Sequence, residues 1–161
     1  MNSKPTPEPV IVERRYRARL EEVWELWTTK DGFESWWGPE GFRVEVHAME
    51  PRVGGPLVYD MIASDPEAIA AMKAMGQPVS HPTRGWFSAL EPMKRLILMH
   101  SIDFIGGVEP YDHTIEVELE PSGHEVRMIV RVHPHRDPHW TKMSLEGFTS
   151  QLKKLDRRFS L

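Results

Sequence analysis

The stretch FESWWGPEGF, residues 33–42, places two adjacent tryptophans directly before a Gly-Pro pair. Gly38 suits the position after a helix because glycine tolerates the left-handed conformation, and Pro39 cannot continue a helix. The pattern therefore predicts a short helix from about Lys30 to Trp37 that ends at this pair. Neighbours on a helix point about 100° apart. We thus expect one tryptophan to anchor the helix in the core and the other to lie along the Gly-Pro exit.

The residues before this stretch predict a strand and a first helix. Val10 to Ala18 partly alternates apolar and charged side chains, which is typical of a half-buried strand. Between Leu20 and Trp27, apolar residues recur at the spacing of one helix face. Residues 1–9 contain three prolines and no apolar segment of a secretory signal, so we expect a disordered lead-in there.

The residues after this stretch predict a run of strands and one long helix. Asp137-Pro138 is an N-cap followed by a proline in the first turn, and apolar residues then recur at spacings of three and four up to Phe159. Strands followed by one terminal helix predict an α+β fold, a curved antiparallel sheet of about six to seven strands wrapped around that helix. The strands are expected at about 42–48, 57–62, 84–90, 95–103, 115–120 and 126–132.

Composition excludes several classes of protein. The chain has 161 residues, no cysteine and a net charge of −4. That length predicts one domain, over residues 10–161. The absence of cysteine excludes disulfides and thiolate chemistry, and it fits a cytoplasmic location. The sequence has no dense basic patch, which argues against a nucleic-acid partner. Its apolar runs are too short to cross a bilayer, which argues against a membrane protein.

The order of these segments resembles the START-like superfamily, also called SRPBCC or the Bet v-like helix-grip fold. Within it, the chain is most similar to the C-terminal domain of the activator of heat-shock-90 ATPase. That co-chaperone carries a separate N-terminal domain for which this chain has no room, which argues against chaperone activation. The matching stretches are VWELWTT (23–29), FESWWGPEGF (33–42), PRVGGPLVYDM (51–61), LEPMKRLIL (90–98), TIEVELEPSGHEVRMIV (114–130) and EGFTSQLKKLDRRF (146–159).

This resemblance implies a cavity between the curved sheet and the long helix. Members of the superfamily carry lipids or hormones, cyclise polyketides, hydrolyse small molecules or bind chaperones, so the fold alone does not define a function. His100 interrupts an apolar face, where it is either a general acid or base or a hydrogen-bonded structural residue. The candidates to line the cavity, or simply to fill it as core, are Tyr59, Met61, Trp86, Leu98, His100, Trp140 and Phe148.

The segment DPEAIAAMKAMGQPVSHP, residues 65–82, is longer than a plain hairpin connection. It predicts a short helix carrying Ile69, Met72 and Met75, capped by an aspartate. Methionine side chains adapt to varied partners. We interpret the segment as a lid over the mouth of the cavity, with an ordinary packed excursion as the alternative.

His133, His135 and His139 lie close together in HPHRDPH. Residues i and i+2 of a strand share a face, so two of them have metal-ligand spacing. However, Pro134 disturbs the strand and Asp137 is needed as an N-cap. We therefore predict a solvated connection and no metal. No phosphate loop, dinucleotide fingerprint or nucleophile elbow occurs, so no cofactor is expected.

The sequence as a whole favours a protein that binds a small hydrophobic or amphipathic molecule. One alternative is a cofactor-independent cyclase or hydrolase that uses His100. Another is a module that contacts a chaperone through an exposed sheet or helix face. An exposed edge strand leaves a homodimer open as well.

Overall fold

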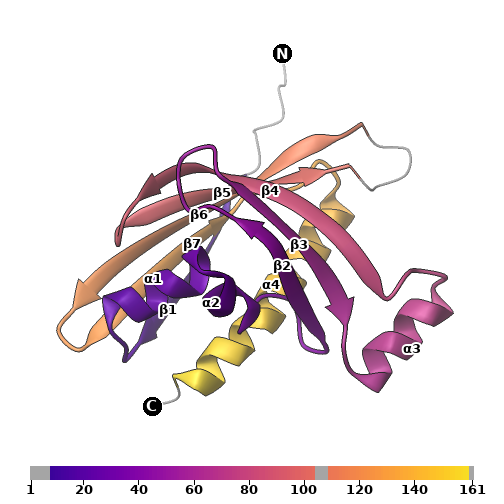
Figure 1. Ribbon diagram of the computed structural model, residues 1–161, viewed down its shortest axis with the longest axis horizontal. Helices are drawn as coiled ribbons and strands as arrows, with labels where there is room; N and C mark the ends of the chain where they lie inside the picture. The colour runs from indigo at the N-terminus through magenta and orange to yellow at the C-terminus, as the bar shows by residue number, and fades with distance from the viewer. Residues whose placement is uncertain (1–7, 104–108, 160–161) are drawn as a thin grey trace.

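The computed structural model describes residues 8–103 and 109–159, so most of the expected disordered lead-in lies outside the described residues. Its seven strands form one curved antiparallel sheet, and the long C-terminal helix α4 lies against the concave face (Figure 1). The predicted α+β fold is confirmed. The strands are β1 (Val10–Tyr16), β2 (Phe42–Met49), β3 (Pro56–Ala63), β4 (Ser80–Glu91), β5 (Arg95–Ile102), β6 (Tyr111–Ser122) and β7 (Glu125–Val132), and the helices are α1 (Leu20–Thr28), α2 (Lys30–Glu34), α3 (Pro66–Ala74) and α4 (Pro138–Arg158).

The strands follow the order β1-β7-β6-β5-β4-β3-β2 across the sheet. Strands β2 to β7 therefore each pair with their neighbours in sequence. β1 instead pairs with β7 and forms the edge of the sheet opposite β2. β1 and β2 are the edge strands. An edge strand exposes unpaired backbone groups, so dimerisation through an edge stays a prediction.

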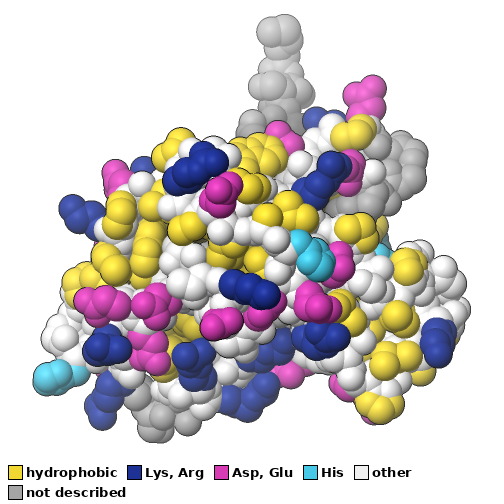
Figure 2. All heavy atoms as spheres, in the orientation of Figure 1, with side chains coloured by type: hydrophobic (Ala, Val, Ile, Leu, Met, Phe, Trp, Pro, Cys, Tyr) yellow, Lys and Arg dark blue, Asp and Glu magenta, His cyan; other side chains and the backbone are white. Residues whose placement is uncertain are grey.

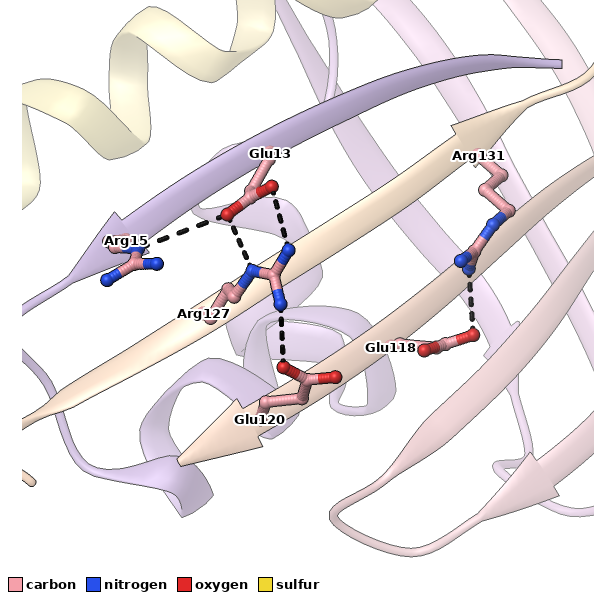
Figure 3. A network of polar contacts seen from close by, with 6 residues as sticks. All are labelled: Glu13, Arg15, Glu118, Glu120, Arg127 and Arg131. Carbon is pink, nitrogen blue, oxygen red and sulfur yellow. Dashed lines mark hydrogen bonds and ion pairs between the residues drawn. The ribbon is translucent and has the colours of Figure 1, made fainter. Parts of the chain in front are cut away.

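The two faces of the sheet differ in chemistry because side chains alternate along each strand. On β5, Leu96, Leu98 and His100 are buried on the concave face. The outer face of β1, β6 and β7 instead carries ion pairs, with Arg127 between Glu13 and Glu120 and with Arg131 on Glu118 (Figure 3). Exposed pairs of this kind each contribute about 0–1 kcal/mol. They mark the solvent side of the sheet more than they stabilise it.

The two adjacent tryptophans follow α2, which ends at Glu34 and is shorter than predicted. Both are buried, with exposed fractions of 1% for Trp36 and 5% for Trp37. The Trp36 indole donates to the backbone carbonyl of Leu26 on α1 at 2.8 Å. The expectation that one tryptophan would lie at the exit is therefore wrong. Because both follow the last helical residue, the 100° helical spacing does not separate them.

The loop after the tryptophans is attached to α4 by side chains of the helix. Gln151 Oε1 accepts from the Gly38 amide at 3.0 Å, and Ser150 Oγ accepts from the Glu40 amide at 2.9 Å. Lys154 Nζ donates to the Phe42 carbonyl at 2.9 Å. Gly38 has φ +97°, but α2 has its C-cap at Ser35, so Gly38 turns the loop and does not cap the helix as predicted. The C-terminal half of α4 is thus fixed to the stretch between α2 and β2.

Candidate functional site

A row of histidine and tyrosine side chains crosses the concave face of the sheet. Tyr59 and His100 are joined through their side chains, and His100 lies directly opposite His113 in the register of β5 and β6. His113 stacks on His135, with ring centroids 3.9 Å apart and ring planes 5° from parallel. The hydroxyl of Tyr111 contacts His135 Nδ1 at 2.6 Å. We call these five residues, Tyr59, His100, His113, His135 and Tyr111, the polar belt.

One end of the polar belt is a chain of hydrogen bonds. Trp37 Nε1–H donates to the Tyr59 hydroxyl at 3.0 Å, since an indole nitrogen can only donate. The Tyr59 hydroxyl is in turn hydrogen-bonded to His100 Nε2, also at 3.0 Å. The Trp37 ring lies parallel to the His100 ring, 14° between planes. His100 Nε2 is therefore engaged by Tyr59, and His100 Nδ1 is the ring nitrogen left for another partner.

The other end of the polar belt fixes the proton of one histidine. His113 Nε2 contacts the His133 carbonyl at 2.6 Å, and a carbonyl only accepts, so this nitrogen carries a proton. The Tyr111 hydroxyl is hydrogen-bonded to His135 Nδ1, so His135 Nε2 is the ring nitrogen left for another partner. In the neutral His113 ring, Nδ1 remains an acceptor.

Burial keeps the histidines of the polar belt uncharged. It lowers the pKa of His100 to about 3, with a further contribution from His113 and His135. It lowers the pKa of His113 to about 4, assisted by His135 and opposed by the hydrogen bond to the His133 carbonyl. Burial also lowers the pKa of His135 and raises that of Tyr59 above its usual range. Desolvation disfavours the charged form of each group.

The helix that covers the belt packs unevenly along its length. Phe148, Gln151, Leu152 and Leu155 are buried, whereas no earlier residue of α4 is buried. Phe148 lies against Trp37, with ring centroids 6.3 Å apart.

The first turn of α4 instead lies beside the belt, where the hydroxyl of Thr141 donates to the His135 carbonyl at 3.2 Å. The helix rises 1.5 Å per residue. The segment from Thr141 to Phe148 therefore crosses above the belt, and Ser144 in it lies on the same helix face as Phe148.

The predicted cavity residues occupy different places in this arrangement. Tyr59, Leu98, His100 and Phe148 are buried and lie between the sheet and α4. Met61 is half-buried beside the Gly38 loop. Trp140 is half-buried in the first turn of α4.

Trp86 requires a correction, because the structure places it on the outer face of β4, paired with Met99. Its neighbour Phe87 takes the inward position opposite Leu98.

The three histidines of HPHRDPH lie in three different environments. His133 Nε2 contacts Glu116 on the outer face at 2.8 Å, His135 stacks in the belt, and His139 is exposed at the start of α4. They do not converge. Among the described residues, no group of three or more His, Asp or Glu side chains is arranged to hold a metal ion.

The predicted lid segment contains α3, which begins after the Asp65 N-cap as expected. Ile69 and Met72 are half-buried and Met75 is 64% exposed, so the helix has no buried residue. Figure 2 shows hydrophobic side chains on the surface over α3. Residues 80–82, at the end of the segment, belong to β4 and pair with β3.

Three residues of the site were missed from sequence: Tyr111, His113 and Gln151. His113 is in phase with the inward Ile115, Val117 and Leu119, and that phase was a usable signal. Gln151 lies on the buried stripe of α4, where a polar residue also stands out. The side-chain amide nitrogen of Gln151, Nε2, is buried with no hydrogen-bond partner among the described residues.

Comparison with known proteins agrees with this fold. Residues 17–160 match the family described as "Activator of Hsp90 ATPase homolog 1-like protein". The chain belongs to this family. A search of curated proteins found no match.

Solved structures similar to this family member come from several bacteria. One is a protein from Chromobacterium violaceum, with 22% identity, coverage of 96% of this chain and 99% of that chain, and a TM-score of 0.70. Another, described as AHSA1, is from Silicibacter pomeroyi, with 20% identity, coverage of 92% and 95%, and a TM-score of 0.71. A third is from Nitrosomonas europaea, with 20% identity, coverage of 93% and 92%, and a TM-score of 0.69. At this identity the likeness concerns the fold alone.

Within the described part of this family member, no helix has the length and apolar character needed to span a bilayer.

Proposed function

We propose that this protein binds a hydrophobic or amphipathic small molecule between the concave face of the sheet and the first turns of α4. The observation that carries the proposal is the polar belt itself. A few convergent hydrogen-bonding groups within an apolar concave face are typical of small-molecule sites. The belt also lies under the part of α4 where no side chain is buried, from Pro138 to Gly147.

The chemistry of His100 favours binding over catalysis. A general base needs a free lone pair and a pKa near the working pH. Here His100 Nε2 is already hydrogen-bonded to the Tyr59 hydroxyl, and burial lowers the pKa of His100 to about 3. This arrangement suits a role for His100 in orienting Tyr59 better than a role in accepting a proton from a substrate.

The proposal is tested by titration with N-phenyl-1-naphthylamine, an uncharged fluorescent amphipath. Ser144→Trp adds a large side chain to the half-buried helix face that also carries Phe148, and Thr149→Trp is the matched control because Thr149 is exposed on the same helix. We expect saturable binding to the wild type, a loss of at least about tenfold in affinity in Ser144→Trp, and little change in Thr149→Trp. Absence of saturable binding to the wild type would refute the proposal. Equal affinity in both variants would place the probe elsewhere and refute this location.

A further inference from the structure

The polar belt offers hydrogen bonds of both kinds without a formal charge. Its remaining ring nitrogens are His113 Nδ1, which accepts because Nε2 donates to a carbonyl, and His100 Nδ1 and His135 Nε2, each of which donates in one neutral tautomer and accepts in the other. A hydroxyl, amide or carbonyl group on a ligand can pair with such a set. A carboxylate, which only accepts, would face the lone pair of His113.

The surroundings of the belt also lack charge on the inward side. In the described parts of β3 to β6, no Asp, Glu, Lys or Arg occupies a position that shares a face with Leu98 and His100. The carboxylates of β6, Glu116 and Glu118, point outward to His133 and Arg131. An ion placed against the belt would therefore find no counter-charge on the inward face of these strands.

Two cations toward the ends of this region, Lys154 and Arg136, are already engaged. The Lys154 ammonium donates to the Phe42 carbonyl, at the loop that follows the tryptophans. The Arg136 guanidinium lies over the Tyr111 ring, 4.9 Å from its centroid, and Arg136 is exposed. Neither replaces a counter-ion at His100 and His113. Burying an unpaired ion costs several kcal/mol, whereas a hydrogen-bonded neutral group avoids that cost.

We propose that the site selects uncharged amphipathic molecules, with a hydroxyl, amide or carbonyl group held by the polar belt, over ionised molecules of the same shape. This inference rests on the proposed function and adds the chemical class of its ligand. It also assigns Ser144, directly above the belt, as the position where one introduced charge changes that selectivity.

The test displaces N-phenyl-1-naphthylamine with decanamide, decanoate and decylammonium, which share one alkyl chain and differ in head-group charge. At about pH 8 the acid and the amine are both ionised. We expect decanamide to displace the probe from the wild type at concentrations at least about tenfold lower than either ion. Displacement by decanoate or decylammonium at equal or lower concentration would overturn the inference and leave the proposed function intact. A wild type that binds no probe removes the proposed function, and the inference with it.

A pair of variants separates head-group recognition from the greater water solubility of ions. Ser144→Lys adds a cation above the belt, and Ser144→Gln adds an uncharged chain of similar length. We expect the affinity of decanoate relative to decanamide to be about tenfold higher in Ser144→Lys than in Ser144→Gln. The solubility difference cancels in this ratio. An unchanged ratio would place the head group away from the belt and overturn the inference.

Discussion

Gln151 on α4 accepts a hydrogen bond from the backbone amide of Gly38, a residue 113 positions earlier in the chain. Both groups are buried, so no water replaces either partner. This bond ties the long helix to the loop that follows the two tryptophans. The same loop is held by Ser150 and Lys154 of α4.

Replacing Gln151 by leucine should destabilise the protein. The substitution leaves the Gly38 amide without an acceptor, a loss of about 1–3 kcal/mol that is partly offset because leucine also removes the buried, unpartnered Nε2. Ser150→Ala is the control, because the Glu40 it contacts is exposed and water can replace the lost acceptor. Urea unfolding of both variants measures the difference. Equal losses in the two would contradict the structural role of Gln151.

Replacing Gly38 by alanine should also destabilise the protein. Gly38 has φ +97°, and an added Cβ would lie 3.1 Å from Met61 Sδ. The left-handed conformation alone costs a residue with a Cβ about 1–2 kcal/mol. Gly147→Ala is the matched control, because Gly147 lies in α4 with no atom within 4 Å of an added Cβ. That change should stabilise the helix by about 0.5–1 kcal/mol. Opposite signs in the free energy of unfolding are the expected result, and a shared sign contradicts it.

Stability should fall as the pH drops below the ordinary histidine range. His100 and His113 have folded-state pKa values of about 3 and about 4, below the ordinary 6.5. The unfolded chain therefore binds more protons than the folded protein between about pH 6.5 and 4. In that window, each of these histidines lowers the free energy of unfolding by up to about 1.4 kcal/mol for each unit that the pH falls. Above about pH 6.5 their full contribution to stability is present.

Urea unfolding between about pH 7.5 and 5 measures this slope, above the range where carboxylates titrate. His113→Gln should reduce the slope by the share of one histidine. A free energy of unfolding that stays constant over this range would show that these histidines are not buried uncharged.

Trp37 and Tyr59 should be energetically coupled through their hydrogen bond. In a double-mutant cycle, Trp37→Phe and Tyr59→Phe should show a coupling energy of about 0.5–3 kcal/mol. The control cycle pairs Trp36→Phe with Tyr59→Phe, because the Trp36 indole donates to Leu26 instead. Its coupling should be smaller. Similar coupling in both cycles would mean that ring packing, and not the hydrogen bond, joins the residues.

Local patterns predicted most of the fold. Alternation gave the strands of the sheet, and Asp65 and Asp137 correctly mark the starts of α3 and α4. The failures arise where a local pattern has two readings. Trp86 and Phe87 are adjacent aromatic residues on one strand, and only the pairing of β4 with β5 decides which of them faces inward.

The site was predicted less well because it depends on pairing between distant strands. His100 was recognised, since it interrupts an apolar face. Its neighbours in the belt come from β3, β6 and the segment after β7, and the register of three strand pairs brings them together. The hydrogen bond from Trp37 to Tyr59 also joins residues whose proximity no spacing in the sequence reveals.

Removing α3 should change ligand binding more than stability if the helix acts as a lid. The helix has no buried residue, so replacing residues 66–78 by a Gly-Gly turn removes little packing. The replacement keeps Ser64 and Asp65 bonded to Gly41 and keeps the Ala63 amide bonded to the Val79 carbonyl. We expect a change in melting temperature below about 4 °C, equivalent to roughly 1 kcal/mol or slightly more in a domain of this size. The affinity for N-phenyl-1-naphthylamine should change by more than about threefold. A folded variant with unchanged probe affinity would show that α3 is an ordinary excursion between β3 and β4, because a helix that covers the mouth of a site must alter access to it.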